Sequence, residues 1–90
     1  MIGDDADITN SGSINADSNG IDVFGDDATI RNPGSIYADS NGIYVRGDGA
    51  DITNSSPTTI VADSDGIVVY GSDFSINNTG SIFVGSDGIY

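Results

Sequence analysis

Apolar and polar residues alternate along this chain in short stretches, and clusters of Gly, Asp, Asn and Ser separate one stretch from the next. For example, Ala28, Ile30 and Asn32 alternate with Thr29 and Arg31. Alternation with a period of two indicates strands with one buried and one exposed face, and the separating clusters have the composition of turns. Because Leu, Glu, Gln and Lys are absent, the strongest helix formers are nearly missing. The pattern therefore predicts an all-β protein of short strands.

One phrase of about 22 residues returns through the whole chain. It is clearest as GDDATIRNPGSIYADSNGIYVR at residues 25–46, and near-copies occupy residues 3–24, 47–70 and 71–90, the third copy with a two-residue insertion. A fixed period of this length is typical of a solenoid, in which each repeat buries its apolar face against its neighbours. We therefore expect residues 1–90 to form a single solenoid domain.

Each repeat predicts three brief strands, and Ile recurs at the same three positions of every copy. Parallel strands that lie one coil apart, about 4.8 Å, place each residue over its counterpart. The three columns are Ile8, Ile30, Ile52 and Ile76; Ile14, Ile36, Ile60 and Ile82; and Ile21, Ile43, Ile67 and Ile89. Their spacing within a coil is uneven, unlike the regular period of hexapeptide β-helices. The expected fold is a right-handed parallel β-helix (β-solenoid) of about four coils, with an antiparallel sandwich as the alternative.

The two ends of the chain are in phase with each other. The last copy is two residues short, and reading Gly88, Ile89 and Tyr90 into Met1 and Ile2 of another molecule restores the repeat. Solenoids normally cover their terminal strands with atypical capping repeats or charged residues, and no such cap is visible in this sequence. We expect the molecule to stack end to end on copies of itself through these five residues, with residues 1–2 completing the coil of a neighbour.

The sequence also resembles a known group of repeat proteins. ITNSGSI at residues 8–14, IRNPGSI at 30–36 and INNTGSI at 76–82 share the pattern I-x-N-x-G-S-I. This pattern is similar to the β-helix repeats of autotransporter passengers and filamentous-haemagglutinin-type adhesins. The resemblance covers the whole chain and implies a β-helix with an adhesion, display or matrix role.

Charge and composition argue against several functions. All 14 acidic residues are Asp and the only cations are Arg31 and Arg46, which leaves a net charge of −12. Such a chain cannot neutralise phosphates, so nucleic acid is not an expected partner. Neither a membrane span nor a signal peptide is visible in this sequence, and the expected location is extracellular or at the cell surface. Because His, Cys and Lys are absent, we find no nucleophile–base pair and expect no enzyme.

The most regular polar column consists of Asn residues at the end of the first strand of each repeat. If these side chains face inward, each amide can donate a hydrogen bond to the side-chain carbonyl of the next. We expect a structural ladder rather than a ligand site, because ligand sites seldom recur once per coil. The column is Asn10, Asn32, Asn54 and Asn78.

Aspartates gather at two predicted corners of each coil, where like charges about 4.8 Å apart repel and attract counterions. Oxygen-rich turns of this kind are candidate ligands for Ca²⁺, the one cofactor that the sequence suggests. The other interpretation is a solvated surface of turn-forming residues. The candidates at one corner are Asp4, Asp5, Asp26, Asp27 and Asp48, and those at the other are Asp17, Asp39 and Asp63.

Outward-facing apolar residues gather on the second and third strands of the repeats. Contiguous exposed aromatic rings indicate a face for lateral association or for stacking on a glycan, and packing along the columns is the alternative. The residues of this face are Phe24, Tyr37, Tyr44, Val68, Tyr70 and Phe83.

These patterns favour a non-enzymatic structural protein that assembles end to end into an acidic extracellular filament. The main alternative is a segment of a long cell-surface adhesin that binds a glycan or a host protein through the aromatic face. An engineered solenoid segment is a third hypothesis.

Overall fold

The computed structural model describes residues 2–55, 59–86, 88 and 89. In this part of the chain the regular structure is all β, and none of it forms a helix that could cross a membrane. The strands are β1 (Asp7–Thr9), β2 (Ser13–Ala16), β3 (Ile21–Phe24), β4 (Thr29–Asn32), β5 (Ser35–Ala38), β6 (Ile43–Arg46), β7 (Asp51–Asn54), β8 (Thr59–Ala62), β9 (Ile67–Tyr70), β10 (Ser75–Asn78) and β11 (Ser81–Val84).

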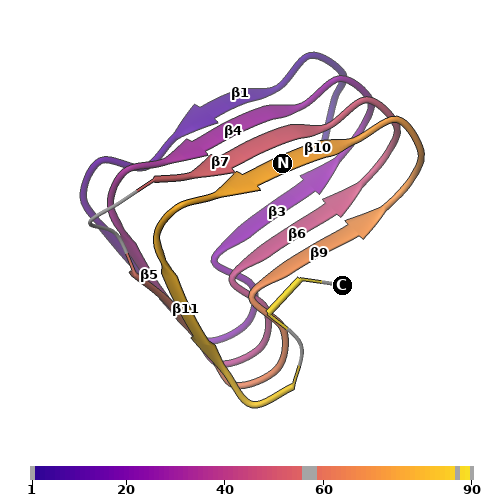
Figure 1. Ribbon diagram of the computed structural model, residues 1–90. Helices are drawn as coiled ribbons and strands as arrows, with labels where there is room; N and C mark the ends of the chain where they lie inside the picture. The colour runs from indigo at the N-terminus through magenta and orange to yellow at the C-terminus, as the bar shows by residue number, and fades with distance from the viewer. Residues whose placement is uncertain (1, 56–58, 87, 90) are drawn as a thin grey trace.

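Each strand pairs with its equivalents in the neighbouring repeats and not with strands of its own repeat. The first sheet has the order β1-β4-β7-β10, the second β2-β5-β8-β11 and the third β3-β6-β9. The three sheets form the sides of a roughly triangular β-solenoid of about three turns (Figure 1). All strand pairs are parallel, so the antiparallel sandwich is excluded and the parallel solenoid is confirmed.

The register between repeats places like residues on like residues. Ile8 lies opposite Ile30, and Ile30 lies opposite Ile52, in the first sheet. The side chains of Ile30, Ile36, Ile52 and Ile60 are completely buried, because each has a repeat above it and another below it. The hydrophobic core is therefore a set of apolar columns that run along the solenoid axis.

The two-residue insertion of the third repeat leaves this register unchanged. Its central residues, 56–58, are outside the described part of the chain. On the two sides of the insertion, Asn32 still pairs with Asn54 and Ile36 with Ile60. The insertion therefore falls between β7 and β8, where insertions are best tolerated, and the pairing of both strands is kept.

The corner between the third and first sheets requires glycine. A side-chain carbon on Gly47 would overlap the carbonyl oxygen of Gly25, and one on Gly71 would overlap that of Gly47. Gly47 also has a φ of 149°, which residues with a side chain rarely adopt. Two residues later the chain is left-handed, with φ of 57° at Asp27 and 74° at Gly49, as short polar residues and glycine allow.

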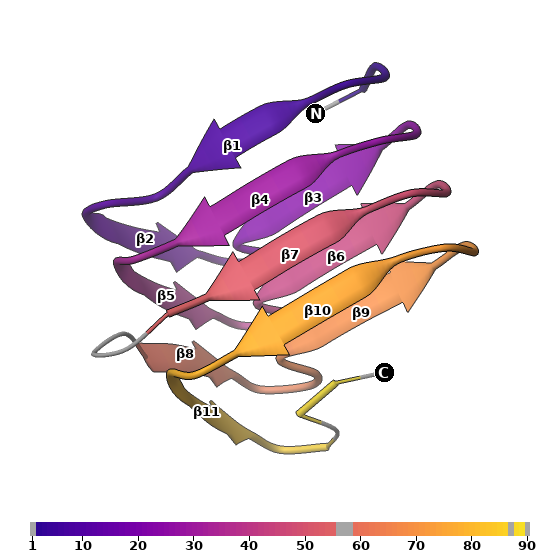
Figure 2. The same ribbon diagram turned by 45° about the horizontal axis from the view of Figure 1, so that its top comes forward.

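The ends of the chain lie at opposite ends of the stack (Figure 2). At one end β1 and β2 have a neighbouring strand on one side only, and at the other end so do β10 and β11. Both ends of the solenoid therefore present strand edges.

We predict that Gly47→Ala lowers the free energy of unfolding by at least about 2 kcal/mol, because the new methyl group meets backbone at an unfavourable φ. The matched control is Gly12→Ala, since nothing lies within 4 Å of a side-chain carbon at Gly12. Urea unfolding of dilute protein measures both variants. Equal stability of the two would contradict this account of the corner.

Candidate functional site: the two ends of the solenoid

The Asn side chains form one chain of hydrogen bonds through the solenoid. Asn10 Nδ2 donates to Asn32 Oδ1 at 2.8 Å, Asn32 Nδ2 to Asn54 Oδ1 at 2.9 Å, and Asn54 Nδ2 to Asn78 Oδ1 at 2.7 Å. Asn32 and Asn54 are completely buried. Asn10 Nδ2 also donates to the carbonyl oxygen of Ser35 at 3.0 Å. The ladder satisfies polar groups at the corner between the first and second sheets, and every donor points toward the following repeat.

A second ladder occupies the corner between the third and first sheets. Here a carboxylate of one repeat accepts a hydrogen bond from a backbone N–H of the next. Asp4 Oδ1 accepts from Asp26 N at 3.0 Å, Asp26 Oδ1 from Asp48 N at 2.9 Å, and Asp48 Oδ1 from Ser72 N at 2.8 Å. These aspartates therefore have a structural role that their recurrence alone did not predict.

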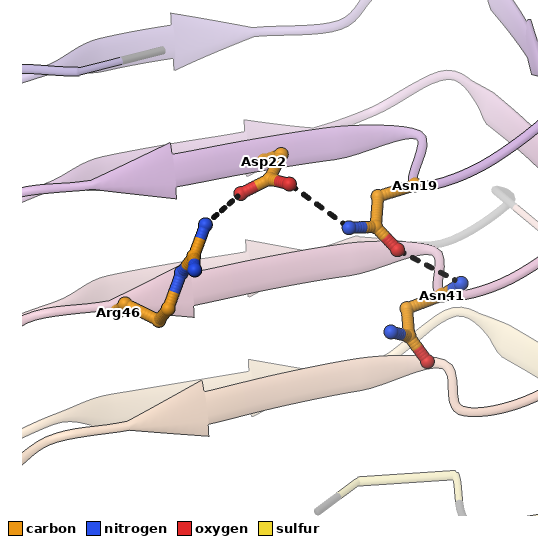
Figure 3. A network of polar contacts seen from close by, with 4 residues as sticks. All are labelled: Asn19, Asp22, Asn41 and Arg46. Carbon is orange, nitrogen blue, oxygen red and sulfur yellow. Dashed lines mark hydrogen bonds and ion pairs between the residues drawn. The ribbon is translucent and has the colours of Figure 1, made fainter.

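A third ladder lies at the remaining corner, between the second and third sheets. Asn19 Oδ1 accepts from Asn41 N at 3.2 Å (Figure 3). Asn41 Oδ1 in turn accepts from Asp65 N at 3.1 Å. The recurrence of a polar residue at this position was visible in the sequence, but its acceptor role was not predicted. Each corner of the triangular solenoid thus carries a side-chain ladder between repeats.

The ladders give the two ends of the solenoid opposite hydrogen-bonding character. In the first repeat, Asn10 Oδ1 accepts a hydrogen bond from Gly12 N at 3.2 Å within its own turn. In the fourth repeat, Asn78 accepts from Asn54. The next donor of the ladder is then Asn78 Nδ2, and the described residues contain no further repeat to receive its hydrogen bond. One end therefore offers an amide donor in the position where the other end offers an amide acceptor.

The backbone shows the same complementarity. Ser35 N donates to the carbonyl oxygen of Gly12 in the preceding repeat at 2.9 Å. In the first repeat the equivalent N–H belongs to Ser13, which has no preceding repeat in the described chain. In the fourth repeat the carbonyl group equivalent to that of Gly12 is the carbonyl of Gly80, and the described chain has no following repeat to donate to it. The unused donors of one end thus match the unused acceptors of the other.

The third sheet is extended by a single residue at each end. Ile2 forms an isolated parallel bridge with Phe24, and Ile89 forms one with Ile67. In the repeat, Ile89 corresponds to the first residue of the third strand and Ile2 to the last. Gly88 precedes Ile89, whereas the predicted interface residues Met1 and Tyr90 lie outside the described part of the chain.

Apolar side chains are exposed where the columns stop. The terminal isoleucines of the first and second sheets are only partly buried, unlike their counterparts in the middle repeats; they are Ile8, Ile14, Ile76 and Ile82. Ile2 is 88% exposed at one end, and Phe74 and Ile89 are each 48% exposed at the other. The ends therefore combine apolar surface with matched backbone and side-chain hydrogen-bonding groups.

The candidate metal ligands are exposed and spread along the corners. Asp5 and Asp27 adopt the left-handed turn conformation, and Asp4, Asp26 and Asp48 accept the backbone hydrogen bonds described above. The remaining candidates, Asp17, Asp39 and Asp63, follow the strands of the second sheet. In the ranges that the structure describes, no three acidic side chains come together in a group that could hold a metal ion.

The predicted aromatic face is divided between two sheets. Tyr37 and Phe83 lie on the outside of the second sheet, whereas Phe24, Tyr44 and Tyr70 lie on the outside of the third. These residues therefore do not share one sheet, because the second and third strands of each repeat form different sides of the triangle (Figure 1).

Val68 is also not part of an exposed face, since only 2% of its surface is accessible. Tyr44 is its partner in the register, and Tyr70 follows two residues later on the same side of the strand. The centroids of these two rings are 5.7 Å apart. Val68 is therefore buried although it alternates with the inward residues of β9, which alternation along a strand could not predict.

We predict that Asn32→Leu lowers the free energy of unfolding by about 1–3 kcal/mol, because the Asn54 carbonyl loses its donor and the Asn10 amide loses an acceptor inside the protein. The outward substitution Thr29→Val in the same strand should change it by less than about 0.5 kcal/mol. Chemical denaturation in dilute solution compares the two variants. An equal effect of both would mean that the Asn ladder contributes nothing.

No protein-family model matches the chain, and no curated protein or solved structure is significantly similar to it.

Proposed function

We propose that this protein is a non-enzymatic structural subunit that stacks head to tail on copies of itself to form an acidic extracellular filament. The observation that supports this most directly is the pair of half-strands on the third sheet. Ile89 extends that sheet at one end with the first residue of a strand, and Ile2 extends it at the other end with the last. In the filament, the two halves form one strand shared by two subunits, and the fourth coil of each subunit is completed by its neighbour.

The Asn ladder continues across this junction with its polarity unchanged. Asn78 Nδ2 of one subunit donates to Asn10 Oδ1 of the next, as Asn54 donates to Asn78 within a chain. The half-buried isoleucines of both ends join the columns and become buried. Each junction therefore reproduces the contacts between repeats, with an axial rise of about 19 Å for four coils of about 4.8 Å.

Charge distribution favours head-to-tail over head-to-head contact. Residues 3–24 contain five Asp, residues 25–46 three Asp with both Arg, residues 47–70 four Asp, and residues 71–90 two Asp. Head-to-tail stacking puts the weakly charged fourth repeat against the strongly charged first repeat. Head-to-head stacking would put the first repeat of one copy against the first repeat of the other, and the aspartates of both, about 4.8 Å apart, would repel each other.

The proposed solenoid is right-handed, because connections between parallel strands of one sheet are right-handed in nearly all proteins. An extracellular matrix or display role agrees with the resemblance of the I-x-N-x-G-S-I repeats to those of filamentous adhesins. The high acidity of the chain suits a filament that stays dispersed in water.

We predict that Ser13→Pro blocks assembly while the subunit stays folded. The proline ring removes the N–H that donates to Gly80 of the preceding subunit, and it stands at the first residue of an edge strand, where proline is tolerated. Loss of this bond and the accompanying steric conflict should raise the critical concentration at least about tenfold, which corresponds to about 1.4 kcal/mol. The matched control, Ser13→Ala, keeps the N–H and should assemble like the parent.

Electron microscopy and sedimentation measure assembly, and circular dichroism checks that each variant is folded. If Ser13→Pro forms filaments with the parent's rise and critical concentration, or if the parent stays monomeric at high concentration, head-to-tail stacking is wrong.

A further inference from the structure

The outer face of the third sheet differs from the rest of the surface in composition and charge. Alternate residues of β3, β6 and β9 point outward there. Two of them carry charge, one of each sign, and the others are apolar or aromatic. We call this set the neutral aromatic face; its exposed or half-buried members are Asp22, Phe24, Tyr44, Arg46 and Tyr70, and Val68 lies buried beneath them.

The two charges of the neutral aromatic face are held close to each other. Arg46 Nη2 is 3.5 Å from Asp22 Oδ1, and Asp22 Oδ2 accepts a hydrogen bond from Asn19 Nδ2 at 2.9 Å (Figure 3). The guanidinium carbon of Arg46 lies 5.1 Å from the ring centre of Phe24 and 5.2 Å from that of Tyr44. These contacts fix the cation against the sheet, while the side chains of Arg46 and Asp22 remain 46% and 41% exposed.

The other surfaces carry a net negative charge. On the second sheet, the hollow over Tyr37 and Val61 is lined by Asp17, Asp39 and Asp63. The first sheet carries two Asp and one Arg, and the corner between the third and first sheets carries six Asp. Asp4 and Asp26 of that corner border the neutral aromatic face beside Phe24 and Arg46. Among the faces that the structure describes, the neutral aromatic face is therefore the one on which two copies of this acidic chain meet with least electrostatic repulsion.

The neutral aromatic face also continues along the proposed filament. Phe24, Arg46 and Tyr70 are aligned in the register, and Ile2 pairs with Phe24 at the end of that row. After head-to-tail stacking, Ile2 of the next subunit follows Tyr70. Phe24 and Tyr70 are 53% and 51% exposed, so a filament would display a row of exposed apolar side chains that only Arg46 interrupts, once per subunit. Contiguous apolar surface of this extent is typical of an interaction site.

We propose that two filaments pair through the neutral aromatic face, with a second copy of this chain as its occupant. The pairing has a two-fold axis perpendicular to the filament axis. Such an axis, passing between β3 and β6, brings β6 of one copy opposite β3 of the other, so each Arg46 faces the strand that carries Asp22. An axis parallel to the filament would instead bring β6 opposite β6 and put the two Arg46 side chains level with each other. The rings of Phe24 and Tyr70 from both copies become buried between the two filaments.

This inference rests on the proposed filament. The mass per length of the fibres tests the pairing separately from filament formation. A single filament contains one 9.2 kDa subunit per axial rise of about 19 Å, and a paired filament contains two. Scanning transmission electron microscopy of unstained fibres measures this ratio. We expect two subunits per rise for the parent and one for Tyr70→Asp, which puts an uncompensated charge on the face. The matched control is Tyr37→Asp on the second sheet, where the ring is 45% exposed; it should keep two subunits per rise.

The assembly-blocked variant Ser13→Pro provides a test that does not depend on filaments. Its neutral aromatic face is intact, so sedimentation equilibrium should show a dimer at high concentration, and adding Tyr70→Asp should return it to a monomer. Parent fibres with one subunit per rise, together with monomeric Ser13→Pro, would overturn the pairing and leave the filament standing. An equal loss of pairing in Tyr37→Asp and Tyr70→Asp would overturn it too. Single fibres that bind a neutral glucan through Tyr70 would instead assign the face to carbohydrate.

Discussion

Hydrogen bonding between one repeat and the next is the interaction on which this structure depends. Outside the strands, the backbone hydrogen bonds of the described residues join positions about one coil apart along the chain, as the strand ladders do. A repeat on its own therefore leaves its backbone groups unsatisfied and its isoleucines exposed, and it becomes stable only between two others. The same dependence makes the ends of the stack the chemically unsatisfied part of the molecule. Assembly through those ends is the direct consequence that we propose.

The corners show how side chains reinforce this one direction of growth. Straight strands stack without help, but each turn exposes peptide groups that no strand partner satisfies. Asn10 satisfies such groups at one corner, with hydrogen bonds to Gly12 N and to the carbonyl oxygen of Ser35. Asp26 and Asn41 do so at the other two corners, where each accepts from a backbone N–H of the next repeat. Gly47 allows the turns to approach within one strand spacing. The acidity of the chain is compatible with this stacking because much of it lies at exposed corners, where water and counterions screen the charges.

The fold could be predicted from the sequence wherever identical residues recur in phase, because a parallel register must then place like on like. The isoleucine columns and the parallel pairing follow from this rule, and the insertion before Thr59 leaves them unchanged. The acceptor role of Asp26 could not be predicted, since it depends on the backbone conformation of the turn rather than on spacing. The division of the aromatic residues between two faces could not be predicted. Alternation along a strand indicates which side chains point outward, but not whether the outer faces of two strands lie on the same side of the molecule. The contacts of Arg46 with two rings depend on side-chain conformations that occur in one repeat only.

The central claim is that the ladder of one subunit continues into the next with its polarity preserved. Solid-state NMR of fibres grown from a mixture of ¹⁵N-labelled and ¹³C-labelled subunits tests it most directly, because cross-peaks then arise only between different molecules. We predict a cross-peak between Asn78 Nδ2 of one subunit and Asn10 Cγ of another, at a distance of roughly 4 Å. Cross-peaks that join Asn10 to Asn10 or Asn78 to Asn78, or fibres in which the side chains of Asn10 and Asn78 show no intermolecular contact, would contradict it.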